Sequence, residues 1–415
     1  MSDVRPFRAL RPAPGLADKV AALPYDVMSS DEARVMAKDN PHSFLYVTKA
    51  EIGLDPAVGH YDDIVYETAA KKLAQMEADG VLFRDEKACY YIYALTMDGR
   101  TQTGVAACAS VDEYLDGRIK KHELTREEKE RDRINHVAAT NANTGPVFLT
   151  HKPCPAVTGF IKAWTAANEP VYSFTPDDGV THKVWVVDED AAIEELRAAF
   201  AGIDALYIAD GHHRNASTAK VALRKREANP GYSKDADFNY YLAVIFSSDE
   251  LKIMDYNRVV KTLNGLTPSE FLNAVEESFD VGFRLEDTPY RPDKRHTFGM
   301  YMDGGWFDLT AKSSIVNDSD PVARLDVSIL QDHLLAPILG ITDPRTDGNI
   351  DFIGGLRGLK ALEEYVDKNG GVAFSMYPTA MEELIAIADS GRIMPPKSTW
   401  FEPKLRSGLF VHKLG

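Results

Sequence analysis

The sequence predicts an α+β protein with mixed sheets, divided into two domains. Short apolar runs bounded by turn residues, typical of buried strands, alternate with longer segments of helical periodicity. Two pairs of such runs flank an Asp-Gly turn, at Asp98-Gly99 and Asp303-Gly304, which is typical of antiparallel hairpins. The chain of 415 residues is also longer than a single hydrophobic core usually serves. We therefore expect a larger domain over residues 1–262 and a smaller one over 263–415.

The elements of the first domain follow in order. Ser29 to Glu32 is typical of a helix start, and Asn40-Pro41 ends that helix. Residues 61–80 have the pattern of an amphipathic helix, which Gly80 closes. Strands are expected at 43–48, 88–96, 104–110, 147–151, 184–187, 205–209 and 240–246, with a short helix at 191–200.

The second domain has the same kinds of element. Thr267 and Pro268 open a helix that continues through Glu277, with proline at the first helical position. The remaining expectations are a strand within 252–260 at the boundary, a hairpin over 297–309, helices at 327–339 and 379–389, and strands at 371–376 and 409–412.

Composition and charge exclude several classes of protein. The formal net charge of −16 argues against general nucleic-acid binding, but it is compatible with a local basic pocket. Cys89, Cys108 and Cys154 are widely spaced and lack CxxC spacing, so we expect reduced thiols and a cytoplasmic protein. The N-terminus has no apolar signal region, and no apolar run approaches the ~20 residues of a membrane span. We therefore expect neither a membrane nor a nucleic acid as partner.

One stretch, Asp210-Gly-His-His-Arg214, combines a strand end, a sharp turn and a helix start. The apolar run before it predicts a buried strand, and residues 212–228 contain neither proline nor glycine before the stop at Asn229-Pro230. Gly211 can take a backbone conformation that a Cβ would penalise. The first N–H groups of a helix bind phosphate or carboxylate, and Arg214 can add a bidentate fork to the same anion.

The polar residues of this stretch have two interpretations. Asp210 is placed to act as a base or a metal ligand, and His212 and His213 can exchange protons near neutral pH. Alternatively, Asp210 is a helix N-cap and the histidines are structural. With Asn215, these residues make five polar groups between an apolar strand and a helix, which favour a functional site. A zinc site formed by His122, His212 and His213 is a further option, although histidines from separate segments have no diagnostic spacing.

A second polar stretch covers residues 116–133. Thr125 and Glu128 fit a capping box, which predicts that a helix starts there. On that helix Lys129 and Arg133 are a like-charge i,i+4 pair, which is unfavourable unless an anion lies between them. A solvated helix face explains the same pattern.

Two further groups of residues are candidates for the same site. His122 and Glu123 precede the expected helix and add a proton carrier and a carboxylate. Lys397, with Ser398 and Thr399, can hold an oxyanion through charge and hydroxyl groups, although a lysine in a loop is usually just solvated. We expect the C-terminal tail around Lys397 to pack back near the cleft of the first domain.

Seven blocks of the sequence point to a known family. They are 23–27 (LPYDV), 40–44 (NPHSF), 119–125 (IKKHELT), 144–147 (TGPV), 209–214 (ADGHHR), 325–330 (LDVSIL) and 394–399 (MPPKST). In these blocks, which extend over nearly the whole chain, the sequence resembles the bacterial family catalogued as domain of unknown function 1015. The family name states no activity.

A narrower resemblance covers residues 208–216. Asp-Gly-His-His-Arg is similar to the phosphate-binding motif of the ParB-like superfamily, which includes sulfiredoxins, CTP-hydrolysing partition proteins and ADP-dependent free-serine kinases. The resemblance implies a ParB-like catalytic core in the first domain and a polyphosphate contact at Asp210 to Arg214. The motif lacks the cysteine of sulfiredoxin, and the acidic chain has no obvious helix-turn-helix. The free-serine kinase is therefore the nearest guide to the chemistry.

These features favour a phosphoryl-transfer enzyme that acts on a nucleotide and a small hydroxyl metabolite, with serine as one candidate. The expected catalytic residues are Asp210, His212, His213, His122 and Glu123, with Asp210 or Glu123 as the base. The residues expected to bind phosphate are Gly211, Arg214, Lys129, Arg133 and Lys397. Mg²⁺ is the expected cofactor, with ADP or ATP as the nucleotide. Two alternatives are a phosphatase or nucleotide hydrolase that uses a histidine or a metal-bound water, and a non-enzymatic nucleotide-binding regulatory protein.

Overall fold

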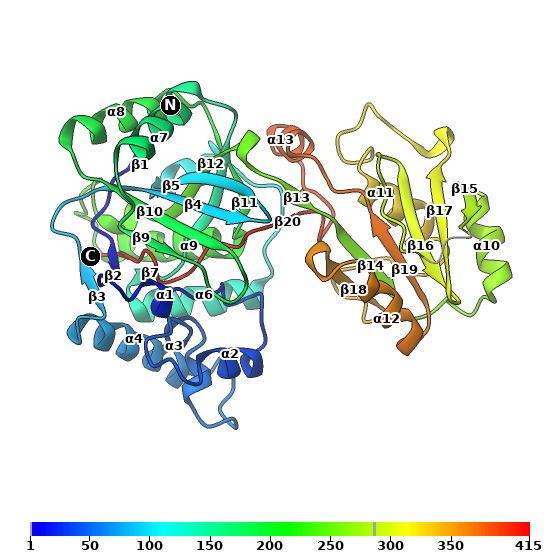
Figure 1. The fold of residues 1–415 in the computed structure, drawn as a ribbon, viewed down its shortest axis with the longest axis horizontal. Helices are drawn as coiled ribbons and strands as arrows, with labels where there is room; N and C mark the ends of the chain where they lie inside the picture. Colours follow the sequence, from blue (N-terminus) through cyan, green and yellow to red (C-terminus); the bar gives the residue numbers. More distant parts are fainter. Residues whose placement is uncertain (1, 285–287) are drawn as a thin grey trace. The chain divides into compact units, whose positions relative to one another are not determined.

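The computed structural model describes residues 2–284 and 288–415, which form two compact units (Figure 1). The first unit comprises the chain up to Leu251 together with Pro403–Gly415, and the second comprises Lys252–Glu402. The sequence analysis placed the division at residue 262. In the structure, residues 256–260 already form a strand of the second unit's sheet, and the segment after residue 402 returns to the first unit. The α+β fold class with mixed sheets is confirmed.

A nine-stranded mixed sheet is the centre of the first unit. In spatial order its strands are β6 (Ile119–Lys120), β11 (Leu206–Asp210), β8 (Val147–His151), β12 (Tyr240–Ser247), β5 (Arg100–Ser110), β4 (Tyr90–Met97), β10 (Thr181–Val187) and β9 (Tyr172–Phe174), with β1 (Val4–Arg5) also paired to β5. The pairs β6–β11 and β8–β12 are parallel, whereas β4–β5 is an antiparallel hairpin. Its turn places Asp98 and Gly99 at φ values of 50° and 76°, as the predicted Asp-Gly turn requires.

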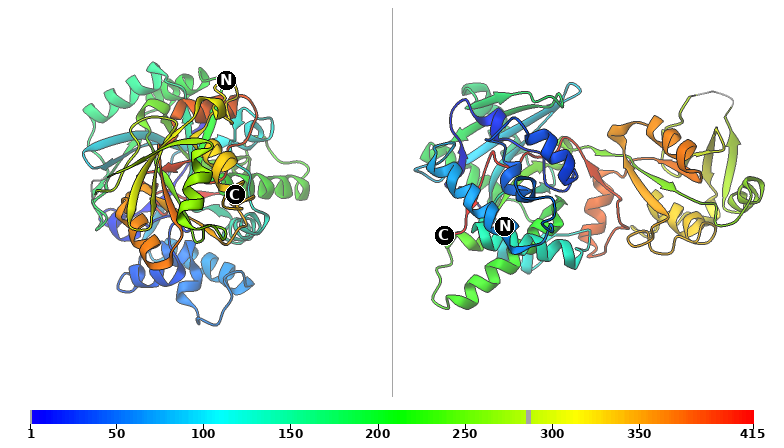
Figure 2. Two further views of the ribbon diagram at one scale, coloured as in Figure 1. Left: turned by 90° about the vertical axis from the view of Figure 1, so that its right-hand side faces the viewer. Right: turned by 90° about the horizontal axis from the view of Figure 1, so that it is seen from below.

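Helices cover this sheet and position the central motif. They are α1 (Ala17–Val20), α2 (Ser30–Ala37), α3 (Leu45–Thr48), α4 (Asp63–Ala78), α5 (Val111–Leu115), α6 (Glu127–Thr140), α7 (Pro155–Ala167), α8 (Asp190–Ala201) and α9 (His212–Ala228). Figure 1 shows α9, α6 and α4 in successive layers on one side of the sheet, and in the view from below the blue helices α1 to α4 lie in front of the strands (Figure 2). Ala219 and Ala222 of α9 belong to the same buried core as the sheet, so α9 packs on the sheet.

One predicted strand is a helix. Residues 43–48 were expected to be extended, but Leu45–Thr48 forms α3. The Ser43 hydroxyl accepts the Leu45 N–H at 3.3 Å, which favours a turn at this point. Phe44, Leu45 and Val47 are all buried in a core cluster next to α2 and α4, so one helical turn buries the apolar run as well as a strand would.

Other predicted segments differ from the structure mainly in extent. Residues 252–260 form two strands, β13 (Ile253–Met254) and β14 (Tyr256–Val260). Of the last predicted strand, 409–412, only His412 lies in β21 (His412–Lys413), which pairs with β7 (Ala142–Asn143). The helix expected at 327–339 is α11 (Asp326–Leu330), which continues as the π-helical turn η5 (Gln331–Leu335). The sequence analysis missed α7, α12 (Lys360–Asn369) and β18 (Ile350–Gly354).

The second unit is built on a six-stranded antiparallel sheet. In spatial order its strands are β15 (Phe279–Phe283), β17 (Gly305–Ala311), β16 (Thr297–Met302), β19 (Val372–Met376), β14 and β18. Leu362 and Val366 of α12 pack on this sheet in one core cluster with Val259. The other helices are α10 (Pro268–Glu276) and α13 (Met381–Asp389). Helix α10 has the predicted proline at its first position, and Thr267 and Glu270 form a capping box that was not predicted.

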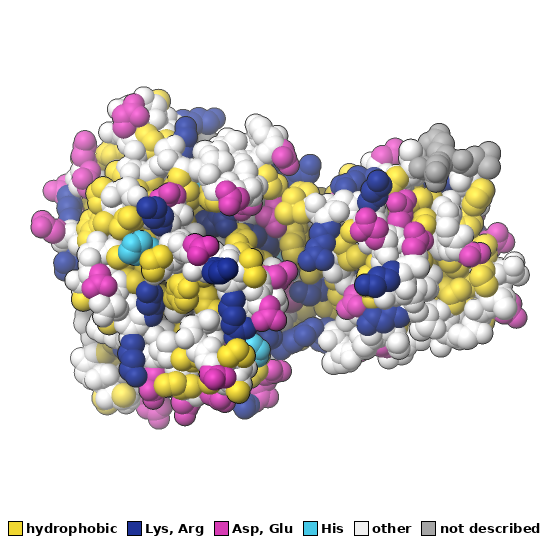
Figure 3. All heavy atoms as spheres, turned by 60° about the horizontal axis from the view of Figure 1, so that its bottom comes forward, with side chains coloured by type: hydrophobic (Ala, Val, Ile, Leu, Met, Phe, Trp, Pro, Cys, Tyr) yellow, Lys and Arg dark blue, Asp and Glu magenta, His cyan; other side chains and the backbone are white. Residues whose placement is uncertain are grey.

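On the face shown in Figure 3, acidic and basic side chains of the first unit are interspersed. Cys89, Cys108 and Cys154 are free thiols. Among the described residues, no helix combines the length and the apolar character needed to cross a membrane.

Asp326, in the first turn of α11, is a buried carboxyl group of the second unit. Its Oδ1 accepts the His296 N–H at 2.9 Å, whereas Oδ2 has no hydrogen-bond partner within residues 2–284 and 288–415. Burial raises the pKa of Asp326 to about 7; the Glu383 carboxylate adds to this effect and Arg295 opposes it. Ionising Asp326 in the folded state is therefore unfavourable.

We expect Asp326→Asn to reduce the pH dependence of stability. The folded-state pKa lies above the unfolded value of ~3.9, so the free energy of unfolding falls as pH rises from about 4 to about 7. The full pKa shift of Asp326 corresponds to about 4 kcal/mol of unfolding free energy. A buried amide N–H without an acceptor in the variant offsets part of this gain. We therefore expect Asp326→Asn to be about 2 kcal/mol more stable than the wild type at pH 8. Urea unfolding at pH 5 and pH 8 measures this. The exposed Asp280→Asn variant should keep the wild-type pH dependence, and an unchanged pH dependence in Asp326→Asn would contradict the prediction.

Candidate functional site

The Asp210-Gly-His-His-Arg214 stretch forms the predicted strand, turn and helix. β11 ends at Asp210 and α9 begins at His212. Gly211 between them has φ 90° and ψ 30°, a left-handed conformation that glycine adopts without a steric penalty. Among the described residues no side chain caps α9; Oδ1 of Asp210 instead accepts the Gly211 N–H at 2.7 Å. The Asp210 N-cap considered as the structural alternative is therefore not formed, and the open end of α9 presents its first N–H groups.

A small cavity lies at this helix start. Its volume is about 40 Å³. Four segments of the first unit line it: Pro24, Asp26 and Val27; Pro146 and Phe148; Asp210, Gly211 and Arg214; and Lys404, Leu405 and Ser407. Three of these segments include blocks on which the family resemblance depends, and the fourth comes from the C-terminal segment.

Arg214 places a partly buried positive charge at the cavity. Its guanidinium lies 5.0 Å from the ring centroid of Tyr25 but makes no hydrogen bond or ion pair with any residue that the structure describes. Burial lowers the pKa of Arg214, while Asp26 and Tyr25 oppose this shift. A shielded guanidinium without an acceptor is unfavourable, and an anionic ligand in the cavity would supply that acceptor.

Gly145 provides the space that Arg214 occupies. A Cβ at position 145 would collide with Nη1 of Arg214 and lie 2.7 Å from the Ser407 hydroxyl. The absence of a side chain at this position therefore allows the guanidinium to reach the cavity.

Asp210 is held in an ion pair rather than left available as a base. Nζ of Lys404 donates to Oδ2 of Asp210 at 2.9 Å. Burial alone would raise the pKa of Asp210, but Lys404 and the Gly211 N–H outweigh it, and the pKa is lowered. Asp210 is therefore a weak base, suited to positioning Lys404 and the turn.

His212 and His213 hold the segment that precedes α6. Nε2 of His213 accepts the Arg126 N–H at 3.0 Å, and Nε2 of His212 accepts the His122 N–H at 3.4 Å. Burial lowers the pKa of His212 well below its ordinary value, so this ring is neutral near pH 7. Oε2 of Glu123 lies 3.9 Å from Nδ1 of His212. These contacts favour a role in positioning for the two histidines.

His122 is buried against His212. The two rings pack edge to face with centroids 4.5 Å apart, and neither ring nitrogen of His122 has a hydrogen-bond partner among the described residues. Burial lowers the pKa of His122 to about 4. In the described part of the chain, no group of three or more His, Cys, Asp or Glu residues is arranged to hold a metal ion, so the zinc option has no ligand set here.

Helix α6 begins differently from the prediction. It starts at Glu127, with Arg126 at the N-cap position, and no side chain caps it. The expected capping box is wrong: the Thr125 hydroxyl donates to Oε2 of Glu130 at 2.7 Å instead. Glu130 lies on the first turns of α6, so Thr125 still ties the preceding segment to the helix.

The two basic residues predicted on α6 lie in different surroundings. Arg133 is buried, with its guanidinium 3.9 Å from the Tyr25 ring centroid, and it forms an ion pair with Asp132 at 2.7 Å. Tyr25 thus contacts both Arg133 and Arg214. Lys129 is exposed, and its Nζ lies 3.1 Å from the Tyr61 hydroxyl.

Lys397 belongs to the second unit. Its φ is 58°, its Nζ lies 5.5 Å from the ring centroid of Tyr256, and its carbonyl accepts a hydrogen bond from Arg258 at 2.9 Å. These contacts fix the loop that contains Lys397.

The structure adds residues to the candidate site that the sequence analysis did not assign to it: Tyr25, Asp26, Gly145, Lys404 and Ser407. Tyr25, Asp26 and Gly145 lie in two of the sequence blocks that resemble the family, so those blocks could have pointed to these residues as part of the site. Lys404 and Ser407 lie in no such block and follow the second unit in the sequence.

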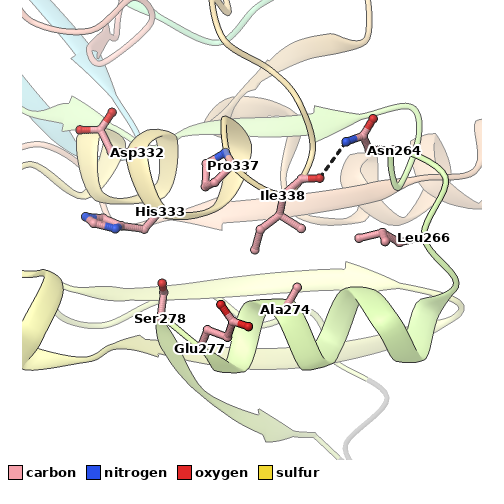
Figure 4. Close-up of a pocket in the computed structure, with 9 residues that line it drawn as sticks. All are labelled: Asn264, Leu266, Ala274, Glu277, Ser278, Asp332, His333, Pro337 and Ile338. Atoms are coloured by element: carbon pink, nitrogen blue, oxygen red, sulfur yellow. Dashed lines mark hydrogen bonds between the residues drawn. The ribbon is translucent and has the colours of Figure 1, made fainter.

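The second unit has a larger and more open pocket of about 550 Å³ (Figure 4). It is lined by Asn264, Leu266, Ala274, Glu277, Ser278, Asp332, His333, Pro337 and Ile338. Figure 4 shows Glu277 and Ser278 at the end of α10 facing the helical segment that contains Asp332 and Ile338. The carboxylates of Glu277 and Asp332 are exposed and so remain hydrated. The cavity at α9, with its shielded charge, is therefore the stronger candidate for a functional site.

Comparisons with known proteins give a family and distant structural likenesses. The family model "Protein of unknown function (DUF1015)" matches residues 4–328. No curated protein gives a significant match. A free serine kinase in complex with AMP is 17% identical, with a TM-score of 0.36 over 74% of this chain and 91% of that chain. SbnI with a C-terminal truncation, from Staphylococcus aureus, is 10% identical, with a TM-score of 0.37 over 72% of this chain and 82% of that chain. These likenesses are too distant to assign a substrate.

Proposed function

We propose that this chain, which belongs to the DUF1015 family of proteins of unknown function, is a phosphotransferase that acts on a nucleotide and a small hydroxyl metabolite, with serine as one candidate. The observation behind the proposal is the Arg214 guanidinium, which lines the cavity at the start of α9 without an acceptor among the described residues. Phosphoryl transfer depends mainly on positioning and on neutralising phosphate charge, which a guanidinium and a helix N-terminus supply.

Asp26 is the carboxylate best placed to accept a proton from the hydroxyl substrate. It lines the cavity, it is exposed, and it has no ion pair within the described residues. Asp210 and Glu123 were the two bases expected from the sequence. Asp210 is neutralised by Lys404, and the Glu123 carboxylate lies beside His212. A carboxylate at the open side of the cavity can take the proton as the hydroxyl attacks the phosphoryl group.

A second carboxylate of the cavity fits the Mg²⁺ that such a reaction uses. Mg²⁺ prefers oxygen ligands and is usually bound by one or two carboxylates together with substrate phosphates and water. Asp210 lines the cavity, is kept ionised by Lys404 and would hold the ion, which leaves Asp26 available as the base. When bound, Mg²⁺ neutralises phosphate charge.

Turnover by the purified chain tests the proposal. We expect ADP or ATP, with Mg²⁺ and a panel of hydroxyl metabolites that includes serine, to yield a phosphorylated metabolite detectable by mass spectrometry. Release of phosphate without any acceptor would replace the proposal by a phosphatase or nucleotide hydrolase. Ligand-induced stabilisation without turnover under any condition would indicate a nucleotide-binding regulatory protein.

A further inference from the structure

We infer that Ser407 and Arg214 act as a pair that binds one terminal phosphate group, so that the C-terminal segment contributes a ligand-binding residue to the site. The inference rests on the proposed function and deepens it, because it names the second donor to the bound anion and the part of the ligand that enters the cavity.

The Ser407 hydroxyl is buried and has no partner within the part of the chain that the structure describes. Ser407 is 1% exposed, and its Oγ makes no hydrogen bond to any group of the described chain. A buried hydroxyl without a partner is destabilising, so its presence at a cavity calls for an acceptor.

The backbone fixes where this hydroxyl lies. The Ser407 N–H donates to the Ala22 carbonyl at 2.8 Å, and the Ala22 N–H donates to the Ser407 carbonyl at 3.0 Å. This antiparallel bridge attaches residue 407 to the segment just before Pro24 and Asp26, which line the same cavity. Two main-chain bonds to Ala22 therefore hold the Ser407 residue, and with it the hydroxyl, at the cavity.

Arg214 and Ser407 converge on one point. A Cβ at Gly145 would contact both Nη1 of Arg214 and Oγ of Ser407, so these two atoms are near neighbours above the Gly145 backbone. A guanidinium and a hydroxyl in this arrangement can donate to different oxygens of one oxyanion.

The size and charge of the cavity limit what it accepts. A volume of about 40 Å³ holds a group of a few atoms, so a terminal phosphate enters and the rest of the ligand stays outside. Asp26 and Asp210 also line the cavity and repel anions, but Lys404 neutralises Asp210. A cation bound with the ligand would offset the charge of Asp26.

Ser247 provides a matched control. Its hydroxyl is also buried and without a partner within the described residues, and it belongs to the same unit, at the end of β12. It does not line the cavity. Ser407→Ala and Ser247→Ala therefore remove the same kind of group from two places.

The experiment measures binding of inorganic phosphate to the full chain by calorimetry with Mg²⁺ at constant ionic strength, with acetate as the carboxylate comparison. We expect Ser407→Ala to raise the phosphate Kd about tenfold, the effect of losing one hydrogen bond to a charged group. Ser247→Ala should bind phosphate like the wild type, and acetate should bind at least tenfold more weakly than phosphate. Thermal unfolding without phosphate should show Ser407→Ala at least as stable as the wild type.

The outcomes separate this inference from the proposed function. Wild-type phosphate affinity in Ser407→Ala, with binding lost in Arg214→Met, would overturn the role of Ser407 and leave the proposed function standing. Unchanged affinity in both variants, or no phosphate binding by the wild type, would overturn both. Equal weakening in Ser407→Ala and Ser247→Ala would show a general structural effect and overturn the inference. Acetate binding as tight as phosphate binding would overturn the assignment to phosphate.

Discussion

Asp26→Asn is expected to lower kcat of the proposed phosphoryl transfer about a hundredfold or more, while phosphate binding changes little. The amide keeps the size and polarity of the carboxylate but cannot accept a proton, and general-base catalysis contributes roughly 10²–10⁴ in rate. Because Asp26 has no ion pair in the described structure, its substitution breaks no salt bridge. Steady-state kinetics and phosphate calorimetry on the same preparation measure the two effects separately.

The exposed Asp18→Asn variant of α1 is the matched control and should retain wild-type kcat. Asp210→Asn gives a second comparison, because it leaves Lys404 without its ion-pair partner. If Asp210→Asn lost turnover at unchanged phosphate affinity, and Asp26→Asn retained it, the base would be Asp210 and the assignment of Asp26 would be wrong.

Arg214→Met is expected to weaken phosphate binding about a hundredfold and to stabilise the protein without ligand. Loss of a shielded charged hydrogen bond to the ligand costs roughly 2–5 kcal/mol of binding free energy. In the ligand-free protein the guanidinium has no acceptor among the described residues and burial lowers its pKa, so its removal should raise the free energy of unfolding by about 1 kcal/mol. Calorimetry and urea unfolding measure these opposite changes.

Arg224→Met, at an exposed position of the same helix, is the control and should leave both quantities close to their wild-type values. A destabilised Arg214→Met variant with wild-type phosphate affinity would indicate that the guanidinium serves packing against Tyr25 rather than an anion.

Local sequence determined the central element well. The helix His212–Ala228 has the predicted bounds because the turn at Gly211 and the stop at Asn229-Pro230 are both local signals. Local sequence predicted the wrong element at residues 43–48. An apolar aromatic run fits a strand or a buried helical turn equally well, and packing in the surrounding core determines which of the two forms.

The candidate site was predicted in part for the same reason. Asp210, Gly211 and Arg214 follow from one strand–turn–helix pattern, and the structure places all three at one cavity. Lys404 and Ser407 could not be predicted, because they reach the cavity through long-range pairing with Asp210 and Ala22. The rings of His212 and His213 accept the backbone N–H groups of His122 and Arg126. These partners depend on the fold around residues 122–126, which the motif alone does not specify.

The first unit is interrupted in sequence by the second, and this affects its synthesis. Residues 403–415 are translated only after Lys252–Glu402. While the ribosome translates the second unit, the nascent chain therefore has Asp210 without Lys404 and Arg214 without Ser407. The proposed ligand site is thus completed only after the second unit has been translated.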